Sequence, residues 1–127
     1  MKARIGVMPE ELIRKRALAI VKGEYIPESG EPKVWFTSMI SLAQVLSNDN
    51  IALLRMMDAQ KPETLTELAE LSGRKTSNLS VTLKTLSLRG FVRLEKNGRS
   101  IKPVALFTDF DIQVDQKFIE LWSKKAA

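Results

Sequence analysis

The chain has 127 residues, 44% of them apolar, and it contains neither cysteine nor histidine. This length favours one compact domain with an appendage over two independent cores. The missing cysteines exclude disulfides and thiolate metal sites, and the missing histidines remove the commonest general base and transition-metal ligand. The sequence also shows no nucleophile beside a base, no phosphate loop and no metal-ligand cluster. We therefore expect no enzyme activity, no metal and no other cofactor.

The net charge of +5 is concentrated in one block of the chain. Residues 73–106 carry eight Lys and Arg against one acid, a net of +7, whereas residues 47–72 carry two against five. A cationic block beside an acidic one produces a directional field that attracts polyanions. A lysine-rich surface that serves only solubility is the plainer alternative.

Nothing in the sequence indicates a membrane protein. There is no run of eighteen apolar residues, and the first residues, MKARIGVMPEELIRK, lack the apolar segment and cleavage site of a secretory signal. We expect a cytoplasmic protein that does not interact with membranes.

The N-terminal residues predict a strand followed by a helix. Residues 2–8 alternate loosely, as in a short strand, and Pro9 with two following acids is typical of a first helical turn. An apolar stripe at helical spacing continues to about Lys22, and Gly23 ends the helix. Turn-forming residues then predict a connection. We expect residues 1–32 to form a strand-helix arm that takes part in dimerisation.

The next segment predicts two helices. Residues 33–36 are a short apolar or extended piece, and helical spacing begins after Ser38. Ser47 is a suitable cap for the second helix, which Pro62 closes.

A further pair of helices follows. Thr64 and Glu67 form a capping box, so a helix is expected to start at Leu65 and to stop at Gly73. The next helix, residues 76–89, carries leucines at positions 79, 83 and 86 on one face, which we assign to the core.

The chain from 91 to 107 predicts a β-hairpin. Asn97 and Gly98 tolerate the positive φ angles of a two-residue type I′ turn. Pro103 cannot donate to a strand ladder, which places the second strand at an edge or a bulge. Residues 108–127 predict a strand with Phe110, Ile112 and Val114 on one face, and then a short amphipathic helix.

The spacing of three small or apolar residues indicates how two of the helices meet. Ala69 is a small residue where two backbones can approach, Gly73 suits a tight turn, and Leu79 can pack into the angle between the helices. This is the helix-turn-helix pattern. With a helix before it and a basic hairpin after it, the order is that of a winged helix-turn-helix domain, so we expect an α+β fold in which residues 33–107 form that domain and residues 1–32 an appendage.

The segment LSGRKTSNLSVTLKTLSLRGFVRLEKNGR resembles the recognition helix and wing of MarR-like and ArsR-like transcription regulators. The stretch PKVWFTS and the following helix resemble more narrowly a group of small predicted prokaryotic DNA-binding regulators, some of them suspected antitoxins. The resemblance implies a sequence-specific double-stranded DNA-binding regulator, a repressor or autorepressor, that works as a homodimer. An antitoxin-type protein that binds a toxin, with DNA binding secondary, is the alternative.

The resemblance also implies which residues meet DNA. In the recognition helix and its entrance these are cationic, short polar and β-branched residues: Arg74, Lys75, Thr76, Ser77, Asn78, Ser80, Val81 and Lys84. In the wing they are Lys96, Asn97, Arg99 and Lys102. Hydroxyls and amides of a helix can read base edges in the major groove, while cations neutralise phosphates.

Two positions depart from the family pattern. Lys75 stands where a Ser or Asp cap is common, so capping could fall to Thr76. Thr82 stands where an aliphatic residue is common, and Leu83 could pack in its place. Either change shifts by one residue the set of side chains that face DNA.

Overall fold

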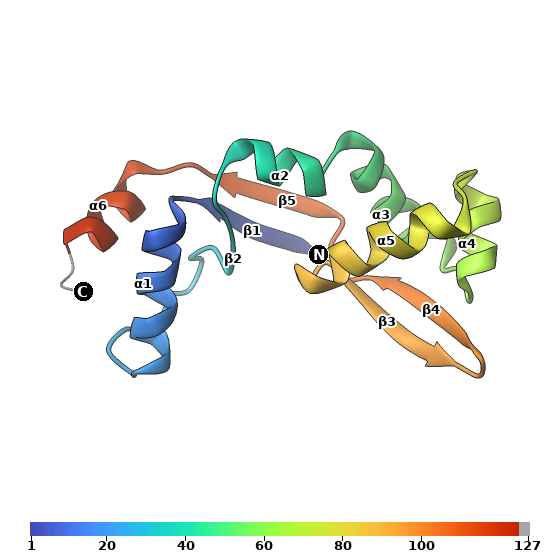
Figure 1. The fold of residues 1–127 in the computed structure, drawn as a ribbon, viewed down its shortest axis with the longest axis horizontal. Coiled ribbons are helices and arrows are strands. Elements are labelled where there is room, and N and C mark those ends of the chain that lie inside the picture. Colours follow the sequence, from blue (N-terminus) through green and yellow to red (C-terminus); the bar gives the residue numbers. More distant parts are fainter. Residues whose placement is uncertain (125–127) are drawn as a thin grey trace. The chain divides into compact units, whose positions relative to one another are not determined.

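The computed structural model describes residues 1–124 and has a mixed α+β fold, which confirms the expected class (Figure 1). The elements follow one another as β1 (Lys2–Val7), α1 (Glu10–Val21), β2 (Val34–Phe36), α2 (Met39–Val45), α3 (Asn48–Gln60), α4 (Leu65–Ser72), α5 (Thr76–Leu88), β3 (Val92–Asn97), β4 (Ser100–Ala105), β5 (Asp109–Gln113) and α6 (Gln116–Lys124). The last three residues of the expected C-terminal helix lie outside the described range. Within residues 1–124, no helix is long and apolar enough to cross a membrane.

The chain divides into two compact units. The helix-hairpin unit contains Met1 and residues 45–109, and the sheet unit contains residues 2–44 and the described part of 110–127. The sequence predicted boundaries at 32 and 107. The observed division differs from the predicted one chiefly at residues 33–44. These residues are grouped with the N-terminal and C-terminal segments rather than with the hairpin.

Local side-chain bonds start the helices of the helix-hairpin unit. Ser47 accepts a hydrogen bond from the amide of Asn50 at 3.2 Å, and Thr64 accepts one from the amide of Glu67 at 3.1 Å, as the sequence predicts. The second half of the capping box is displaced by one residue. The Glu67 carboxylate accepts from the amide of Glu63 at 3.2 Å rather than from that of Thr64.

Leucines of α5 anchor the core of the helix-hairpin unit. Leu79 and Leu86 are completely buried and Leu83 nearly so, which confirms their assignment to the core. Further buried apolar side chains of this unit come from the residue pair before α3, from α3 and α4, and from the start of the hairpin; they include Leu46, Leu53, Leu54, Met57, Leu68, Phe91 and Val92.

The sheet unit contains three strands in the order β2-β1-β5. Strands β1 and β2 are parallel, with Ile5 opposite Val34, and α1 provides the crossover that a parallel pair requires. Gly6 lies directly under the Trp35 ring, where any Cβ would overlap the indole. The glycine therefore allows the tryptophan to lie flat on β1.

Aromatic residues from distant parts of the sequence form the core of the sheet unit. Trp35 and Phe118 meet edge to face with ring centroids 5.3 Å apart, and both pack with Trp122, Met8 and Leu12. The C-terminal helix is thus held against the N-terminal elements by apolar burial, which is the main stabilising term in such contacts.

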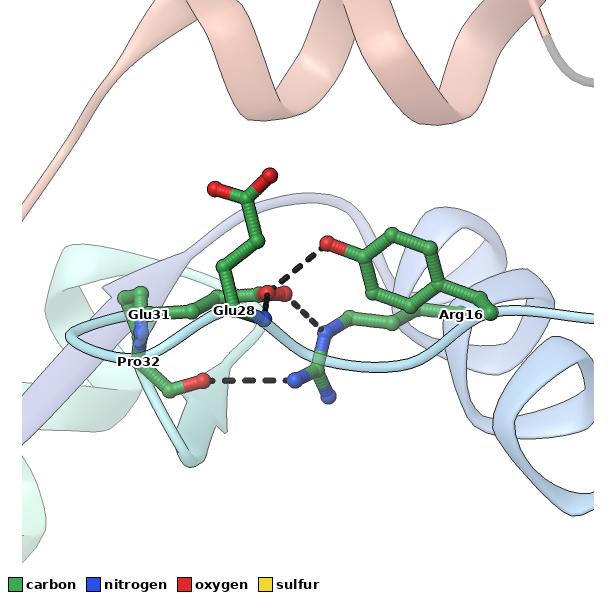
Figure 2. Close-up of polar contacts among 5 residues, drawn as sticks. Arg16, Glu28, Glu31 and Pro32 are labelled. Atoms are coloured by element: carbon green, nitrogen blue, oxygen red, sulfur yellow. Dashed lines mark hydrogen bonds and ion pairs between the residues drawn. The ribbon is translucent and has the colours of Figure 1, made fainter.

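A buried ion pair joins α1 to the connection between α1 and β2 (Figure 2). The Arg16 guanidinium donates to the Glu31 carboxylate at 2.8 Å, and the two side chains are only 10% and 6% exposed. Glu31 also accepts from the Tyr25 hydroxyl at 2.7 Å and from the amide of Glu28 at 3.0 Å. Both oxygens of the buried Glu31 carboxylate therefore have at least one donor, which a buried charge requires.

This environment moves two pKa values in opposite directions. Burial, then the hydrogen bond to Glu31 and the repulsion from neighbouring carboxylates, raises the pKa of Tyr25 to about 12. Burial also acts to raise the pKa of Glu31, but the hydrogen bonds from Arg16, Tyr25 and the Glu28 amide outweigh it and hold that pKa below its ordinary value.

Tyr25 is the only tyrosine in the chain, so its ionisation can be followed directly. Because its pKa is raised in the folded protein, the neutral phenol contributes stability below pH 10, and this contribution is lost as the pH rises from 10.0 toward about 12. The ultraviolet absorbance of phenolate should show a midpoint near 12 in the native protein and near 10 in denaturant. Tyr25→Phe should abolish the signal. A native midpoint equal to that in denaturant would contradict the described cluster.

Candidate nucleic-acid interface

Helices α4 and α5 are joined by a three-residue connection, Gly73 to Lys75. Gly73 is the C-cap of α4 in the left-handed conformation, with φ +74°, and its amide donates to the Ala69 carbonyl at 2.9 Å. Only glycine adopts such a φ without strain, so it ends α4 and redirects the chain. Leu79 is completely buried in the first turn of α5. Gly73 and Leu79 therefore have the local environments expected of them, and Ala69 is half-buried; its close approach to α5 stays a prediction.

The start of α5 is not capped by a side chain. Lys75 is the N-cap and makes no capping hydrogen bond, and Thr76 is the first helical residue. The expectation that Thr76 would take over the cap is therefore wrong. The first amides of α5 consequently keep their partial positive charge at the surface, close to the Lys75 ammonium.

The polar residues of α5 lie on the face opposite the buried leucines. All the residues predicted for recognition are exposed, apart from half-buried Arg74; the exposed ones are Lys75, Thr76, Ser77, Asn78, Ser80, Val81 and Lys84. Val81 is 68% exposed, so its methyl groups are accessible at the surface. Leu83 packs inward and Thr82 is half-buried, so Leu83 does take the aliphatic position.

Arg74 is held against α3. Its guanidinium donates to the Asn50 side-chain oxygen at 3.1 Å, and the Asn50 amide group donates to the Val45 carbonyl at 2.9 Å. Arg74 is therefore a positioned cation at the entrance to α5 rather than a mobile side chain. Sequence spacing gave no signal for Asn50, which lies 24 residues away from Arg74.

The hairpin has the predicted strands but a turn displaced by one residue. Asn97 pairs with Ser100, so the two loop residues are Gly98 and Arg99, not Asn97 and Gly98. Gly98 has φ +64°. Lys61 is the only non-glycine residue with positive φ among the described residues, so Arg99 has a negative φ. A positive φ at the first loop position alone fits a type II′ turn, so the predicted type I′ turn is wrong.

Asn97 is displaced from the turn because its side chain serves another contact. Its amide group donates to the Glu63 carbonyl at 3.0 Å, and the Glu63 carboxylate lies 3.6 Å from the Lys102 ammonium. We call these two contacts the Glu63 clamp. Glu63 lies between α3 and α4, so the clamp ties the hairpin to the start of α4.

The clamp separates the four predicted wing residues into two pairs. The side chains of Asn97 and Lys102 are held by Glu63. The side chains of Lys96 and Arg99 are exposed and, within residues 1–124, make no hydrogen bond or ion pair. Arg93, which lies in the same strand as Lys96, is paired with Glu95 at 3.1 Å. The unpaired charge of the hairpin is therefore concentrated at its tip.

The hairpin tip and the first turn of α5 lie at the same end of the helix-hairpin unit (Figure 1). The chain reverses after α5 at Gly90, with φ +82°, and the hairpin then diverges from the helix axis (Figure 1). The start of α5 and the tip of the hairpin therefore lie on the same side of the unit but stand apart from each other.

A protein-family model matches part of the chain. The family model HVO_A0114 matches residues 45–112, which is 68 of the 127 residues and covers α3 to β5. No curated protein matches the chain.

The Glu63 clamp can be tested through stability. Asn97→Ala leaves the Glu63 carbonyl without its donor and should lower the free energy of unfolding by about 1 kcal/mol, measured by urea titration. Lys96→Ala, one residue away and exposed, is the matched control and should change it by less than about 0.5 kcal/mol. Equal effects of the two substitutions would show that the clamp contributes nothing.

Proposed function

The chain belongs to the HVO_A0114 family, and from this premise we propose that the matched segment is a winged helix-turn-helix module of a transcription regulator that binds double-stranded DNA sequence-specifically. One observation carries the proposal. The exposed face of α5 is polar and cationic, and the hairpin that carries Lys96 and Arg99 has its tip on the same side of the unit as the start of α5 (Figure 1).

Helix α5 has the chemistry for reading a major groove. An α-helix fits that groove, and its N-terminal half reaches the base edges. Ser77, Asn78 and Ser80 offer hydroxyls and an amide for hydrogen bonds with bases, and exposed Val81 offers methyl groups to thymine. No acid occurs between residues 73 and 94, so nothing on this stretch repels phosphate.

Cations around α5 supply the contacts that position the protein. Lys75 and Lys84 flank the polar face, and the free amides at the helix start attract a phosphate. At the hairpin, Lys96 and Arg99 reach the backbone or the minor groove. Asn97 and Lys102, expected to contact DNA, instead hold the hairpin in place through Glu63.

We further propose a homodimer that acts as a repressor or autorepressor. Strand β5 is an edge of the three-stranded sheet; its residue Ile112 is 44% exposed, and Val114, directly after the strand, is 63% exposed. An open edge with apolar side chains favours pairing with a second copy. Two recognition helices then meet half-sites about 34 Å apart. A small protein seated on an operator represses by excluding other proteins from it.

DNA binding should depend steeply on salt. With about six phosphate contacts, affinity for duplex DNA is expected to fall about a thousandfold between about 50 and 200 mM salt. Lys84→Ala and Arg99→Ala should each weaken binding to all sequences and reduce the salt slope by about one, while Ser77→Ala and Asn78→Ala should change the sequence that is selected from a random pool. Lys22→Ala, an exposed lysine of the sheet unit, is the control. Absence of binding at low salt would refute the proposal.

The dimer has its own test. Sedimentation should show a dimer at micromolar concentration, and Val114→Asp should shift it toward monomer because a charge opposes strand pairing at that edge. Ile101→Asp, at a comparably exposed apolar residue of the hairpin, should leave the dimer intact. A wild-type monomer both free and on DNA would disprove the homodimer without touching the DNA-binding proposal.

A further inference from the structure

The sheet unit contains an open cavity of about 690 Å³ that the proposed DNA contact does not use. Its walls come from β1, from the connection between α1 and β2, from β5 and from α6. The residues that matter for its chemistry are Arg4, Glu28, Asp111, Gln113, Lys117 and Phe118. A volume of this size is typical of small-molecule sites.

Two oppositely charged groups on one side of the cavity have no partner. Figure 2 shows the Glu28 carboxylate pointing away from the Arg16–Glu31 pair and toward α6. The Arg4 guanidinium lies over Gly30, only 2.8 Å from where a Cβ on that glycine would stand. Within residues 1–124, neither charged group makes a hydrogen bond or an ion pair. Glycine at position 30 therefore leaves room for an unpaired cation in the cavity wall.

Further charged groups line the cavity from β5 and α6. Asp111 and Gln113 lie two residues apart in β5, and the Gln113 amide group donates to the Asp111 carboxylate at 3.3 Å. Lys117, in the first turn of α6, has its ammonium 3.7 Å from the Asp115 carboxylate and is largely exposed. Both of these charged groups therefore already have a partner in the protein.

Aromatic and aliphatic side chains complete the lining. Tyr25, whose hydroxyl donates a hydrogen bond to Glu31, also lines the cavity. Phe118 and Leu121, one turn apart on α6, add apolar surface. Leu121 is 39% exposed and supplies most of the accessible apolar surface, whereas Phe118 is 8% exposed because it also packs in the core.

We propose that this cavity binds a small zwitterion with an apolar side chain, of the size of an amino acid or a dipeptide. Glu31 is paired with Arg16 and Lys117 with Asp115, so within residues 1–124 the lining charges without a partner are Arg4 and Glu28. A ligand of one sign is attracted by one of these two groups and repelled by the other. A ligand that carries both an ammonium and a carboxylate pairs with both Glu28 and Arg4, and places its apolar part against Leu121 and Phe118.

The first test compares probes that differ only in charge. Leucine and leucyl-leucine are titrated into the full-length protein without DNA, beside leucinamide, which keeps only the cation, and N-acetyl-leucine, which keeps only the anion. At least one of the two zwitterions should bind about tenfold or more tightly than either singly charged analogue, because each lost ion pair removes a charge-assisted hydrogen bond. Amide NMR shifts should fall on residues 25–31 and 111–121 and spare α5.

The second test uses the two unpaired charges. Arg4→Gln should remove the advantage of the zwitterion over leucinamide and preserve its advantage over N-acetyl-leucine; Glu28→Gln should do the reverse. Lys22→Gln and Glu24→Gln, exposed residues of the same unit outside the cavity, are the controls and should change nothing. No shift with any probe, equal affinity for all four, or the same response from both cavity variants would overturn the proposal. None of these outcomes bears on DNA binding, which is measured on the other unit.

Discussion

The burial of three leucines determines what α5 can do. Leu79, Leu83 and Leu86 repeat at helical spacing and occupy the interior of the helix-hairpin unit. Their burial fixes the rotation of the helix about its axis. If the helix rotated so that these leucines became exposed, the fold would lose about 2 kcal/mol or more of stability for each side chain. The polar residues on the other side, from Ser77 to Lys84, are therefore held outward whether or not a ligand is present. Every functional proposal for this unit depends on that rotation.

Features set by near neighbours were predictable from the sequence. The helix starts at Ser47 and Thr64, the stop at Gly73 and the leucine core all follow from residues within one or two turns of each other, and the structure confirms them. The turn of the hairpin shows where this reasoning ends. Asn97 has the local propensity for a type I′ turn. Its side chain instead donates a hydrogen bond to the Glu63 carbonyl, 34 residues away, and such a tertiary contact is not visible in the local sequence.

The same limit applies to the grouping of segments. Residues 33–44 precede the predicted DNA-binding helices in the chain, which favoured assigning them to one domain. The structure groups them with both chain ends because Trp35 packs on Gly6 and against Phe118. No periodicity within a short window reports a contact between residues 35 and 118. The charges that line the cavity of the sheet unit come from four separate segments, so their grouping could not be predicted from the sequence for the same reason.

The Glu63 clamp gives the hairpin a thermodynamic property as well as a position. A protruding two-stranded loop is ordinarily a mobile arm whose freedom must be surrendered at the moment of association. Here the Asn97 and Lys102 contacts remove much of that freedom when the chain folds. This loss of entropy is therefore part of the free energy of folding, and the hairpin is preorganised in the free protein.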